Sequence, residues 1–445
     1  MYQILDINKM KTRKSIVPFV FLTVIVVLAM VFPGVPSQAD HQFDAADVAW
    51  MLTSTALVMI MTPGLAFFYG GMVKKKNVIS TMLQSFICMA VVAVLWVVFG
   101  FSLVFGDSWG GIIGNPFTYF MFHGVIDGPN WPGAPTIPFA LFAMYQLKFA
   151  IITPALITGA FAERIRFTSY ILFICLFFIF IYAPLAHATW HPEGILAQMG
   201  VLDFAGGTVV HLSAGVAALA SALYLKQGSG NGGHEPARIT YVLLGTGLLW
   251  FGWFGFNAGS AFGATALAAS ALATTTTASG AGALAWIFFD AARGKRPTAM
   301  GVCIGVVVGL VAITPAAGFV TVPHSLVMGA VAAIISRLVV EWRTHSRVDD
   351  TLDVFPCHGV GGMVGMLLTG VFATGTINEA VETDGLFFGE TGLFWAHLIG
   401  LIGSTAFTLV MAFILLKITD LVSTLRVTPE EEELGLDISQ HGEKL

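Results

Sequence analysis

What the sequence has little of is charge. Only 11% of its 445 residues are Asp, Glu, Lys or Arg, whereas 56% are hydrophobic, and the mean hydropathy is +0.82. A soluble globular protein carries roughly 25% charged residues, so the composition excludes a soluble domain. It predicts an all-α polytopic protein that lies in a lipid bilayer. The net charge of −5 decides little, because in a membrane protein the side on which a charge lies matters more than the total.

The residues that most enzymes need are also scarce. The four cysteines lie in apolar stretches without metal-ligand spacing, so small buried hydrophobes are favoured over a disulfide or a metal site. The sequence contains no phosphate-binding glycine loop, no clustered metal ligands, and no paired nucleophile and base outside the apolar segments. We therefore expect no enzyme activity, no cofactor, no metal and no nucleic-acid binding.

The chain divides into three parts. Residues 1–39 are predicted to be a cleaved signal peptide, because a basic start precedes an apolar core and Ser37-Gln38-Ala39 has the small-x-small form of a cleavage site. An additional uncleaved helix is the alternative. Residues 40–420 form the membrane domain, and 421–445 form a C-terminal tail.

The membrane domain contains eleven apolar segments of spanning length. They are 46–72, 78–106, 137–162, 167–187, 204–225, 239–261, 265–291, 298–316, 320–342, 354–375 and 392–418. An odd number of spans suits two five-helix units plus one extra helix. Successive five-helix units start on opposite faces, so they would be inverted repeats about an axis in the membrane plane.

Lysine and arginine are absent from alternate connections between these segments. The connections that lack them are 107–136, 188–203, 262–264, 317–319 and 376–391, whereas the others carry basic residues. Positive charge concentrates on the cytoplasmic side of membrane proteins. We therefore expect a multi-pass protein of the inner (plasma) membrane, with its N-terminus outside and its C-terminus in the cytoplasm.

Two segments place an acid and a histidine close together at membrane depth. They are Asp203-Phe-Ala-Gly-Gly-Thr-Val-Val-His211 and Asp353-Val-Phe-Pro-Cys-His358. Ionisable groups inside a bilayer are costly and usually functional. In inverted repeats the two histidines approach each other near the midplane, so we predict that His211 and His358 meet in a conduction path. A purely structural pair that locks the two halves is the alternative. Asp353 is expected to mirror Asp203 as a helix cap.

Together with three further motifs, these segments resemble the ammonium transporter (Amt/Mep/Rh) family, in its bacterial Amt-type form. The further motifs are Gly159-Ala-Phe-Ala-Glu-Arg-Ile-Arg166, Gly252-Trp-Phe-Gly-Phe-Asn-Ala-Gly-Ser260 and Gly435-Leu-Asp-Ile-Ser-Gln-His-Gly442. The resemblance implies eleven helices around a pseudo-twofold axis, a homotrimer with one pore in each subunit, and a PII-type signalling protein that binds at the cytoplasmic exit.

The resemblance also implies roles for individual residues. Trp190 and Ser260 match the outer recruitment site, and Asp203 lies beside it. Phe149 and Phe256 match a ring pair that closes the pore, and His211 with His358 matches a twin-histidine pair below it. Moving bare ammonium into an apolar pore costs tens of kcal/mol in the Born limit, whereas cation–π contacts return about 0.5–2 kcal/mol each. The predicted function is an ammonium transporter or channel.

A buried lysine supports a second hypothesis. Lys148 lies inside the third segment, next to Phe149, and a fixed positive charge near the path would repel ammonium. The alternative is an ammonium sensor of the same fold that signals through its C-terminal tail or through a fused signalling domain after Lys444-Leu445, with little or no transport. A bicarbonate or carbon dioxide channel of the Rh branch is a further possibility, although Trp190 and Ser260 favour ammonium.

Overall fold

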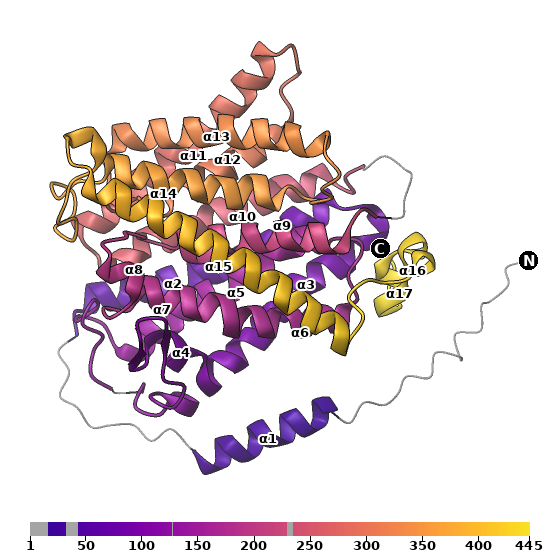
Figure 1. Ribbon diagram of the computed structural model, residues 1–445, viewed down its shortest axis with the longest axis horizontal. Helices are drawn as coiled ribbons and strands as arrows, with labels where there is room; N and C mark the ends of the chain where they lie inside the picture. The colour runs from indigo at the N-terminus through magenta and orange to yellow at the C-terminus, as the bar shows by residue number, and fades with distance from the viewer. Residues whose placement is uncertain (1–16, 33–42, 127, 229–234) are drawn as a thin grey trace, which may run out of the picture.

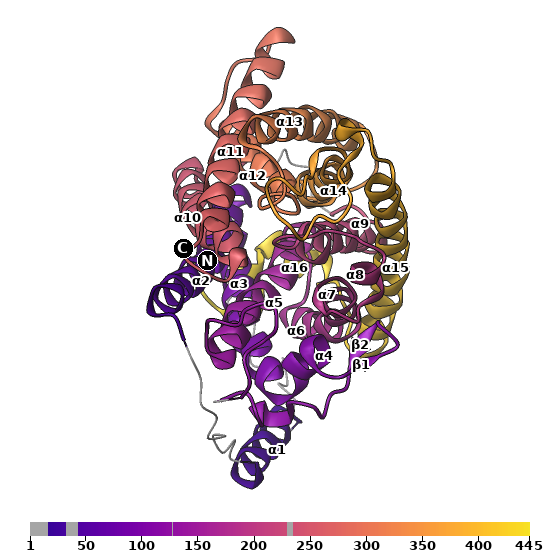
Figure 2. The same cartoon turned by 90° about the vertical axis from the view of Figure 1, so that its left-hand side faces the viewer.

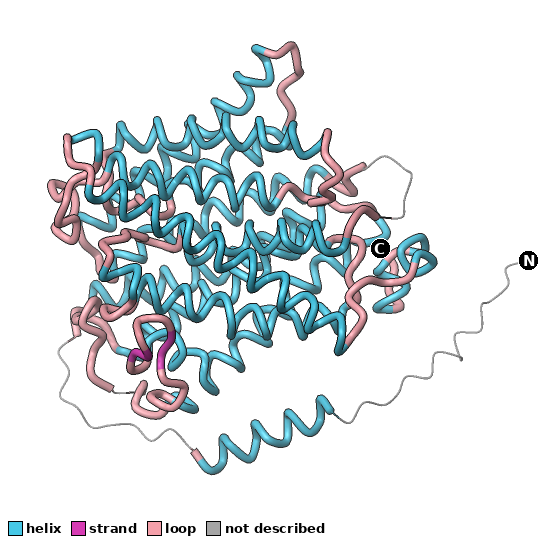
Figure 3. The backbone as a smooth tube through the Cα atoms, viewed as in Figure 1, coloured by secondary structure: helices cyan, strands magenta, loops and turns pink. Residues whose placement is uncertain are grey.

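The computed structural model describes residues 17–32, 43–126, 128–228 and 235–445. Helices lying side by side along one common direction make up most of it (Figure 1, Figure 3). The longer helices are α2 (Ala45–Met72), α3 (Val78–Leu95), α5 (Phe139–Phe161), α6 (Phe167–Phe177), α9 (Ser213–Leu225), α10 (Ile239–Ala258), α11 (Ala266–Ala292), α12 (Ala299–Ile313), α13 (Val322–Thr344), α14 (Gly361–Phe372) and α15 (Gly392–Val422). Figure 2 looks along this bundle and shows α15 on one side and α2 on the other.

Four π-helical turns adjoin these helices. Two of them lead into short helices: η3 (Trp96–Gly100) precedes α4 (Phe101–Phe105), and η5 (Phe178–Tyr182) precedes α7 (Ala183–Trp190). The other two begin longer helices: η6 (Gly207–Leu212) precedes α9, and η8 (Phe355–Val360) precedes α14. π-turns are rare and frequently lie at functional positions. His211 lies in η6 and His358 in η8.

All eleven predicted segments are helical. Within the described residues, nine helices are long and apolar enough to cross a membrane: Ala45–Met72, Lys75–Phe105, Phe139–Phe161, Phe167–Gln198, Gly207–Leu225, Ile239–Ala261, Val322–Thr344, Phe355–Phe372 and Gly392–Val422. The other two predicted segments correspond to α11 and α12. α12 has only 15 residues, and α11 is rich in Ala, Gly and Thr. The helical character predicted from the apolar segments is therefore confirmed.

A further helix precedes the bundle. α1 (Val17–Val31) is apolar and short, and it lies beside the bundle, where the ring of Phe32 contacts Phe120 at a centroid distance of 5.4 Å. The predicted cleavage site Ser37-Gln38-Ala39 lies outside the described residues.

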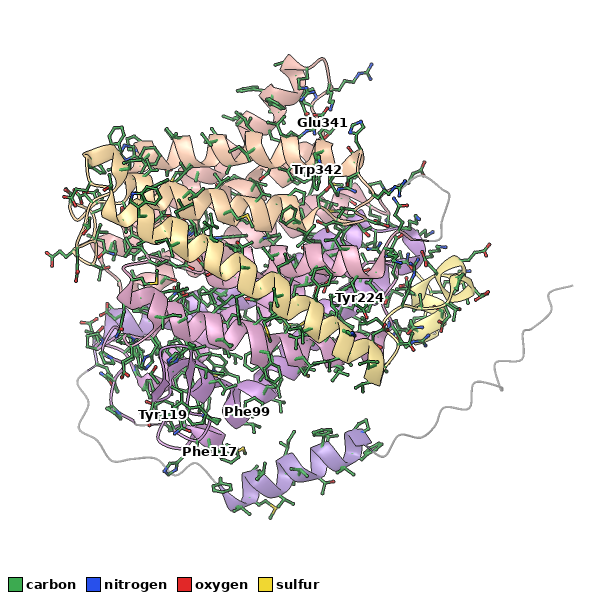
Figure 4. All side chains as sticks on the ribbon, in the orientation of Figure 1. Phe99, Phe117, Tyr119, Tyr224, Glu341 and Trp342 are labelled. Atoms are coloured by element: carbon green, nitrogen blue, oxygen red, sulfur yellow. The ribbon has the colours of Figure 1, made fainter. Side chains whose placement is uncertain are left out.

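The two ends of the bundle differ. One end, here called the loop end, carries an antiparallel pair of two-residue strands, β1 (Ser108–Trp109) and β2 (Ile113–Gly114), in which Ser108 pairs with Gly114. The all-α prediction did not include this pair. The other end, here called the tail end, carries α16 (Pro429–Leu434) and α17 (Leu436–His441). In Figure 4 the labelled Phe117 and Tyr119 lie toward the loop end and Tyr224 toward the tail end.

The C-terminal tail is attached to the tail end by reciprocal hydrogen bonds. The Asp437 carboxylate accepts from the backbone N–H of Ser80 at 2.8 Å, and the Asn77 side chain accepts from the N–H of Leu436 at 2.8 Å. Arg166 forms an ion pair with Glu431 at 3.1 Å. Burial raises the pKa of the Asp437 carboxyl, and its backbone hydrogen bonds oppose the rise. These contacts join the tail to the start of α3.

Candidate functional site

His211 and His358 lie face to face in the middle of the bundle. Their Nδ1 atoms are 3.3 Å apart, their ring centroids are 5.4 Å apart, and the ring planes differ by 25°. The side chains are 1% and 4% exposed. A neutral imidazole has one N–H, so one Nδ1 donates and the other accepts, and the two rings hold opposite tautomers. The structure thus brings together the two histidines that the sequence analysis paired.

Two glycines allow the histidine-bearing turns to approach. A Cβ on Gly215 of α9 would lie 2.0 Å from the backbone nitrogen of Gly359 in η8. Real Cβ contacts under about 3 Å do not occur, so only glycine lets these two backbones touch. A Cβ on Gly362 would likewise lie 3.0 Å from the backbone nitrogen of Leu212. The close crossing of α9 and η8 sets the distance between the two imidazoles.

Asp203 organises the start of the His211 turn. Its Oδ1 accepts from the backbone N–H groups of Gly206 and Gly207 at 2.8 and 2.6 Å. Its Oδ2 accepts from those of Thr208 and Val209 at 2.8 and 3.3 Å. Burial raises the pKa of this carboxyl, and the four N–H groups oppose the rise because they favour the charged form. Asp203 is therefore a helix cap, as its predicted role requires.

The corresponding cap in the other half is Asp350, and the expectation for Asp353 was wrong. Asp350 Oδ2 accepts from the backbone N–H of Phe355, the first residue of η8, at 2.7 Å. Asp353 instead forms an ion pair with Arg343 at 2.5 Å and has a positive φ of 56°. Burial raises the pKa of Asp353 to about 7, and Arg343 opposes the rise. The closest acid in sequence is thus not the cap.

Two phenyl rings are stacked above His211, on the side of Trp190. The centroids of Phe149 in α5 and Phe256 in α10 are 4.2 Å apart with an interplanar angle of 26°. Both side chains are buried, at 1% and 0% exposure. The centroid of Phe256 is 6.0 Å from that of His211. The rings fill the space between the histidine pair and the aromatic residues of the loop end.

Trp190 and Ser260 each connect to this ring pair. The indole of Trp190 packs edge-on against Phe149 at 5.9 Å, and its Nε1–H donates to the carbonyl oxygen of Asp203 at 3.0 Å. Ser260 in the turn η7 (Gly259–Ala261) donates its hydroxyl to the carbonyl oxygen of Phe256 at 2.9 Å. All four aromatic and hydroxyl residues singled out from the sequence therefore belong to one contact network.

Sequence reasoning missed Tyr145. Its hydroxyl lies 3.2 Å from Ser260 Oγ and 2.9 Å from the carbonyl oxygens of Gly255 and Phe256. It also packs on Phe149 at a centroid distance of 5.1 Å. The available signal was its place one helical turn before Phe149, on the same face of α5.

Below the phenyl rings lies a very small apolar cavity. Its volume is about 10 Å³, and it is lined by Met61, Leu65, Phe68, Ile152, Leu156, His211, Leu249, Trp253, Phe256, Val307 and His358. The Nε2 atom of His211 is buried and has no hydrogen-bond partner. A cavity of this volume holds about one water-sized molecule. Larger cavities of about 390 and 460 Å³ lie elsewhere, and neither histidine lines them.

Trp253 was also missed. Its indole stacks on His211 with centroids 5.1 Å apart at 19°, and its Nε1–H donates to Thr314 Oγ1 at 2.9 Å. A tryptophan within an apolar helix usually indicates ordinary packing, so the sequence offered only its place in the motif around Gly252 and Phe256. Trp253 lines the cavity, and its stacked indole restricts rotation of the His211 ring.

Lys148 does not line this cavity. The cavity-lining residues of α5 are Ile152 and Leu156, whereas Lys148 is turned about 100° from Phe149 and lies one helical turn before Ile152 without lining the cavity. Lys148 is half-buried. The residues facing the cavity therefore include no fixed positive charge.

Most of the chain is similar to known proteins. The family model described as Ammonium Transporter Family matches residues 49–445. The chain belongs to the ammonium transporter family. It is 46% identical over 405 residues to a putative ammonium transporter of Methanothermobacter thermautotrophicus, covering 90% of this chain and 98% of that protein. The family resemblance of the sequence motifs is thereby confirmed.

Solved structures of family members have the same fold. The crystal structure of Saccharomyces cerevisiae Mep2 is similar with a TM-score of 0.82 at 35% identity, covering 87% of this chain and 89% of that one. A structure named Sensor Amt Protein is similar with a TM-score of 0.80 at 26% identity, covering 89% and 98%. The same fold thus occurs in Mep2 and in a protein named as a sensor.

Proposed function

We propose that this family member is a membrane transporter that moves ammonium nitrogen past the histidine pair. The observation that carries the proposal is the buried pair of His211 and His358, which lines an apolar cavity of about 10 Å³ and in which His211 Nε2 has no hydrogen-bond partner. A buried unsatisfied polar atom costs about 1–3 kcal/mol. A small molecule that donates or accepts one hydrogen bond would recover that energy, and ammonia has the right size and does both.

The walls of the cavity decide which form of the substrate passes this depth. Apart from the imidazoles and one indole, they are aliphatic and phenyl groups. A bare cation would lose tens of kcal/mol of solvation there in the Born limit. We propose that nitrogen crosses the cavity as ammonia and that the histidine pair relays the proton. A proton is accepted at the bare Nε2 of the ring whose Nδ1 donates, the Nδ1 proton passes to the other ring, and that ring releases its own Nε2 proton, so both tautomers are inverted and one proton has moved. Two facing imidazoles suit proton relay better than one, because one ring accepts the proton that the other donates.

We further propose that ammonium is recruited at the loop end. The indole of Trp190 offers a π face, Ser260 offers a hydroxyl oxygen, and Phe149 forms the floor between them. Cation–π contacts contribute about 0.5–2 kcal/mol each when desolvated. Asp203 holds the indole through its carbonyl and contributes a negative charge without direct ligation. The stacked Phe149 and Phe256 rings then act as a gate that must part for each molecule.

The architecture supporting this path is proposed to be the full family arrangement. Eleven spans form two inverted five-helix units plus α15, and the two cap–histidine turns are supporting evidence for the repeat. The absence of Lys and Arg from alternate connections favours an outer loop end and a cytoplasmic tail end. We also propose a homotrimer in the inner membrane, a cleaved signal peptide over 1–39, and a PII-type signalling protein as a partner at the tail end.

An ammonium sensor is the second candidate. Its support is the similarity to the structure named Sensor Amt Protein and the tail attached to α3 through Asp437, which offers a route from the bundle to a signalling partner. The position of Lys148 off the cavity lining weakens the electrostatic argument for this alternative. We therefore favour transport.

One experiment separates the two candidates. The purified chain is reconstituted in liposomes on a solid-supported membrane, and ammonium pulses are applied, with potassium pulses and protein-free liposomes as controls. Transport predicts a sustained current that saturates with ammonium concentration. A brief charge displacement that reports binding, without sustained current at any concentration, would refute transport and support sensing.

A further inference from the structure

His397 bridges two parts of the chain that lie far apart in sequence. It lies in α15 and is 0% exposed. Its Nδ1 lies 2.8 Å from the carbonyl oxygen of Met366 in α14, and its Nε2 lies 3.1 Å from the backbone nitrogen of Leu202. A carbonyl only accepts and a backbone N–H only donates, so Nδ1 carries the proton and Nε2 is bare. Both ring nitrogens are used, and both partners are backbone atoms.

The backbone that His397 holds is the one that carries the recruitment site. Leu202 directly precedes Asp203, whose carbonyl oxygen accepts from Trp190 Nε1 at 3.0 Å. The Asp203 carboxylate in turn fixes the four N–H groups at the start of the His211 turn. A shift of Leu202 would therefore move the indole and the cap together.

The second partner of His397 leads to the same place. This partner is Met366, whose carbonyl oxygen accepts from His397 Nδ1. The sulfur of the same Met366 accepts a hydrogen bond from Thr208 Oγ1 at 2.7 Å. Thr208 N donates to Asp203 Oδ2 at 2.8 Å. His397, Met366, Thr208, Asp203 and Leu202 thus form a closed ring of contacts around the base of the recruitment site.

Packing around His397 is tight on both sides. A Cβ on Gly370 would lie 3.1 Å from His397 Cβ, and a Cβ on Gly400 would lie 2.9 Å from Val201 Cγ2. Gly400 therefore lets the segment before Leu202 press directly against α15. At these two points the backbones of α14 and of the segment before Leu202 contact α15 without an intervening side chain on the glycines.

We propose that His397 is a positioning residue for ammonium recruitment. It holds the Leu202–Asp203 backbone so that the Trp190 indole stays at the mouth of the path, without itself touching the substrate. The inference rests on the proposed function, because it assigns recruitment to Trp190. His397 contacts neither the histidine pair nor the phenyl rings directly, so its loss should weaken binding more than passage.

The test compares variants that keep or remove the two hydrogen bonds. His397→Gln retains one donor and one acceptor on a side chain of similar reach, whereas His397→Met keeps the bulk and removes both. We expect His397→Met to raise the half-saturating ammonium concentration about tenfold, with a smaller effect on the maximal current. His397→Gln should stay within about twofold of wild type. His324→Met is the matched control, because His324 stacks on Phe372 at 4.6 Å, away from Trp190 and Asp203.

A second variant keeps the test decisive if His397→Met does not fold. Gly400→Ala pushes on Val201 from α15 without altering the imidazole, and it should raise the half-saturating concentration in the same direction. The idea is overturned if Gly400→Ala or His397→Met lowers only the maximal current, or if His397→Gln is as impaired as His397→Met.

The failure of the proposed function would look different. Wild-type protein would then give no sustained current, and ammonium affinity would be measured by calorimetry on the same variants. Weaker binding by His397→Met together with wild-type binding by His397→Gln would uphold the positioning role even in a protein that does not transport. Equal affinity of all three proteins would overturn it.

Discussion

Asp203 and Asp350 cap two π-helical turns in the same way. Each carboxylate accepts from the backbone at the start of its turn, and each precedes the histidine of that turn by eight residues, His211 in η6 and His358 in η8. The match is unequal in strength, because Asp203 accepts four N–H groups and also holds Trp190 through its carbonyl. The turn that carries His211 is thus held by more hydrogen bonds than the turn that carries His358.

Replacing Asp203 tests this cap. Asp203→Asn turns one acceptor oxygen into an NH₂ group, so two buried N–H groups lose their partner at a cost of about 1–3 kcal/mol each. We expect a fall in the free energy of unfolding of about 2 kcal/mol or more and an almost complete loss of ammonium current. Thermal unfolding in detergent and current recordings measure the two effects.

The control for that variant is Asp44→Asn. Asp44 caps α2 through the N–H groups of Ala46 and Asp47 but is exposed, so its loss should cost about 1 kcal/mol and spare the current. An Asp203→Asn protein with the stability and current of wild type would remove the role assigned to Asp203.

Removing both histidines tests the selectivity of the cavity. His211→Ala with His358→Ala replaces two imidazoles by methyl groups and enlarges a space that now holds about one small molecule. Water entering that space would solvate ions, so we expect potassium pulses to evoke current in the double variant and none in wild type. Unchanged current and unchanged ion selectivity would contradict the relay.

The burial of the Asp353 carboxyl predicts a pH dependence of stability. Burial raises the pKa of this carboxyl from the ordinary 3.8 to about 7. Between these values the folded chain keeps a proton that the unfolded chain has released, so the contribution of Asp353 to stability falls as pH rises through this interval. We expect the loss of melting temperature between pH 5 and pH 8 to be smaller in Asp353→Asn than in wild type.

A companion variant checks the assigned cause. Arg343 forms the 2.5 Å ion pair with Asp353, so Arg343→Gln should raise the pKa of Asp353 further and extend the sensitive interval upward in pH. The same slope of melting temperature against pH in wild type and Asp353→Asn would show that Asp353 does not titrate in this range.

The tail contacts predict resistance to proteolysis. Asp437→Ala removes the acceptor of Ser80 N–H, and a loss of about 1.4 kcal/mol would raise the detached population about tenfold. Cleavage within Glu430–Glu433 by a glutamate-specific protease should accelerate accordingly, because cleavage follows the open population. Glu443→Gln, at an exposed side chain, is the control. Equal cleavage rates would mean that Asp437 does not hold the tail.

Lys148 provides a prediction of no effect. Because its side chain is not among the residues that line the cavity, Lys148→Gln should leave the half-saturating ammonium concentration and the maximal current within about twofold of wild type. A large gain of current would show that its charge does reach the path and would revive the sensor alternative.

Much of this arrangement could be predicted from the sequence because its signals are strong. Long apolar segments predicted the helices, and the rarity of histidine at membrane depth drew attention to His211 and His358. The wrong expectation for Asp353 came from judging by closeness in sequence. A carboxylate that caps a π-turn accepts from N–H groups several residues ahead. Asp350 is therefore the cap, and the nearer acid, Asp353, forms the ion pair with Arg343.

Other parts depend on contacts that no local pattern encodes. Tyr145 and Trp253 look like ordinary aromatic packing until α5 and α10 come together around Phe256. His397 resembles a lone packing histidine, and its partner Leu202 lies 195 residues earlier in the chain. Even the decisive closeness of Gly215 to Gly359 follows from the crossing of two halves.

The stack of Phe149 on Phe256 has a consequence for the cell. With the ring centroids 4.2 Å apart, the two phenyl groups leave no room between them for a column of water at this depth of the proposed path. In the proposed transporter, hydrated sodium and potassium ions would be blocked while the rings stay stacked. A cell would then hold many copies without losing the gradients of these ions.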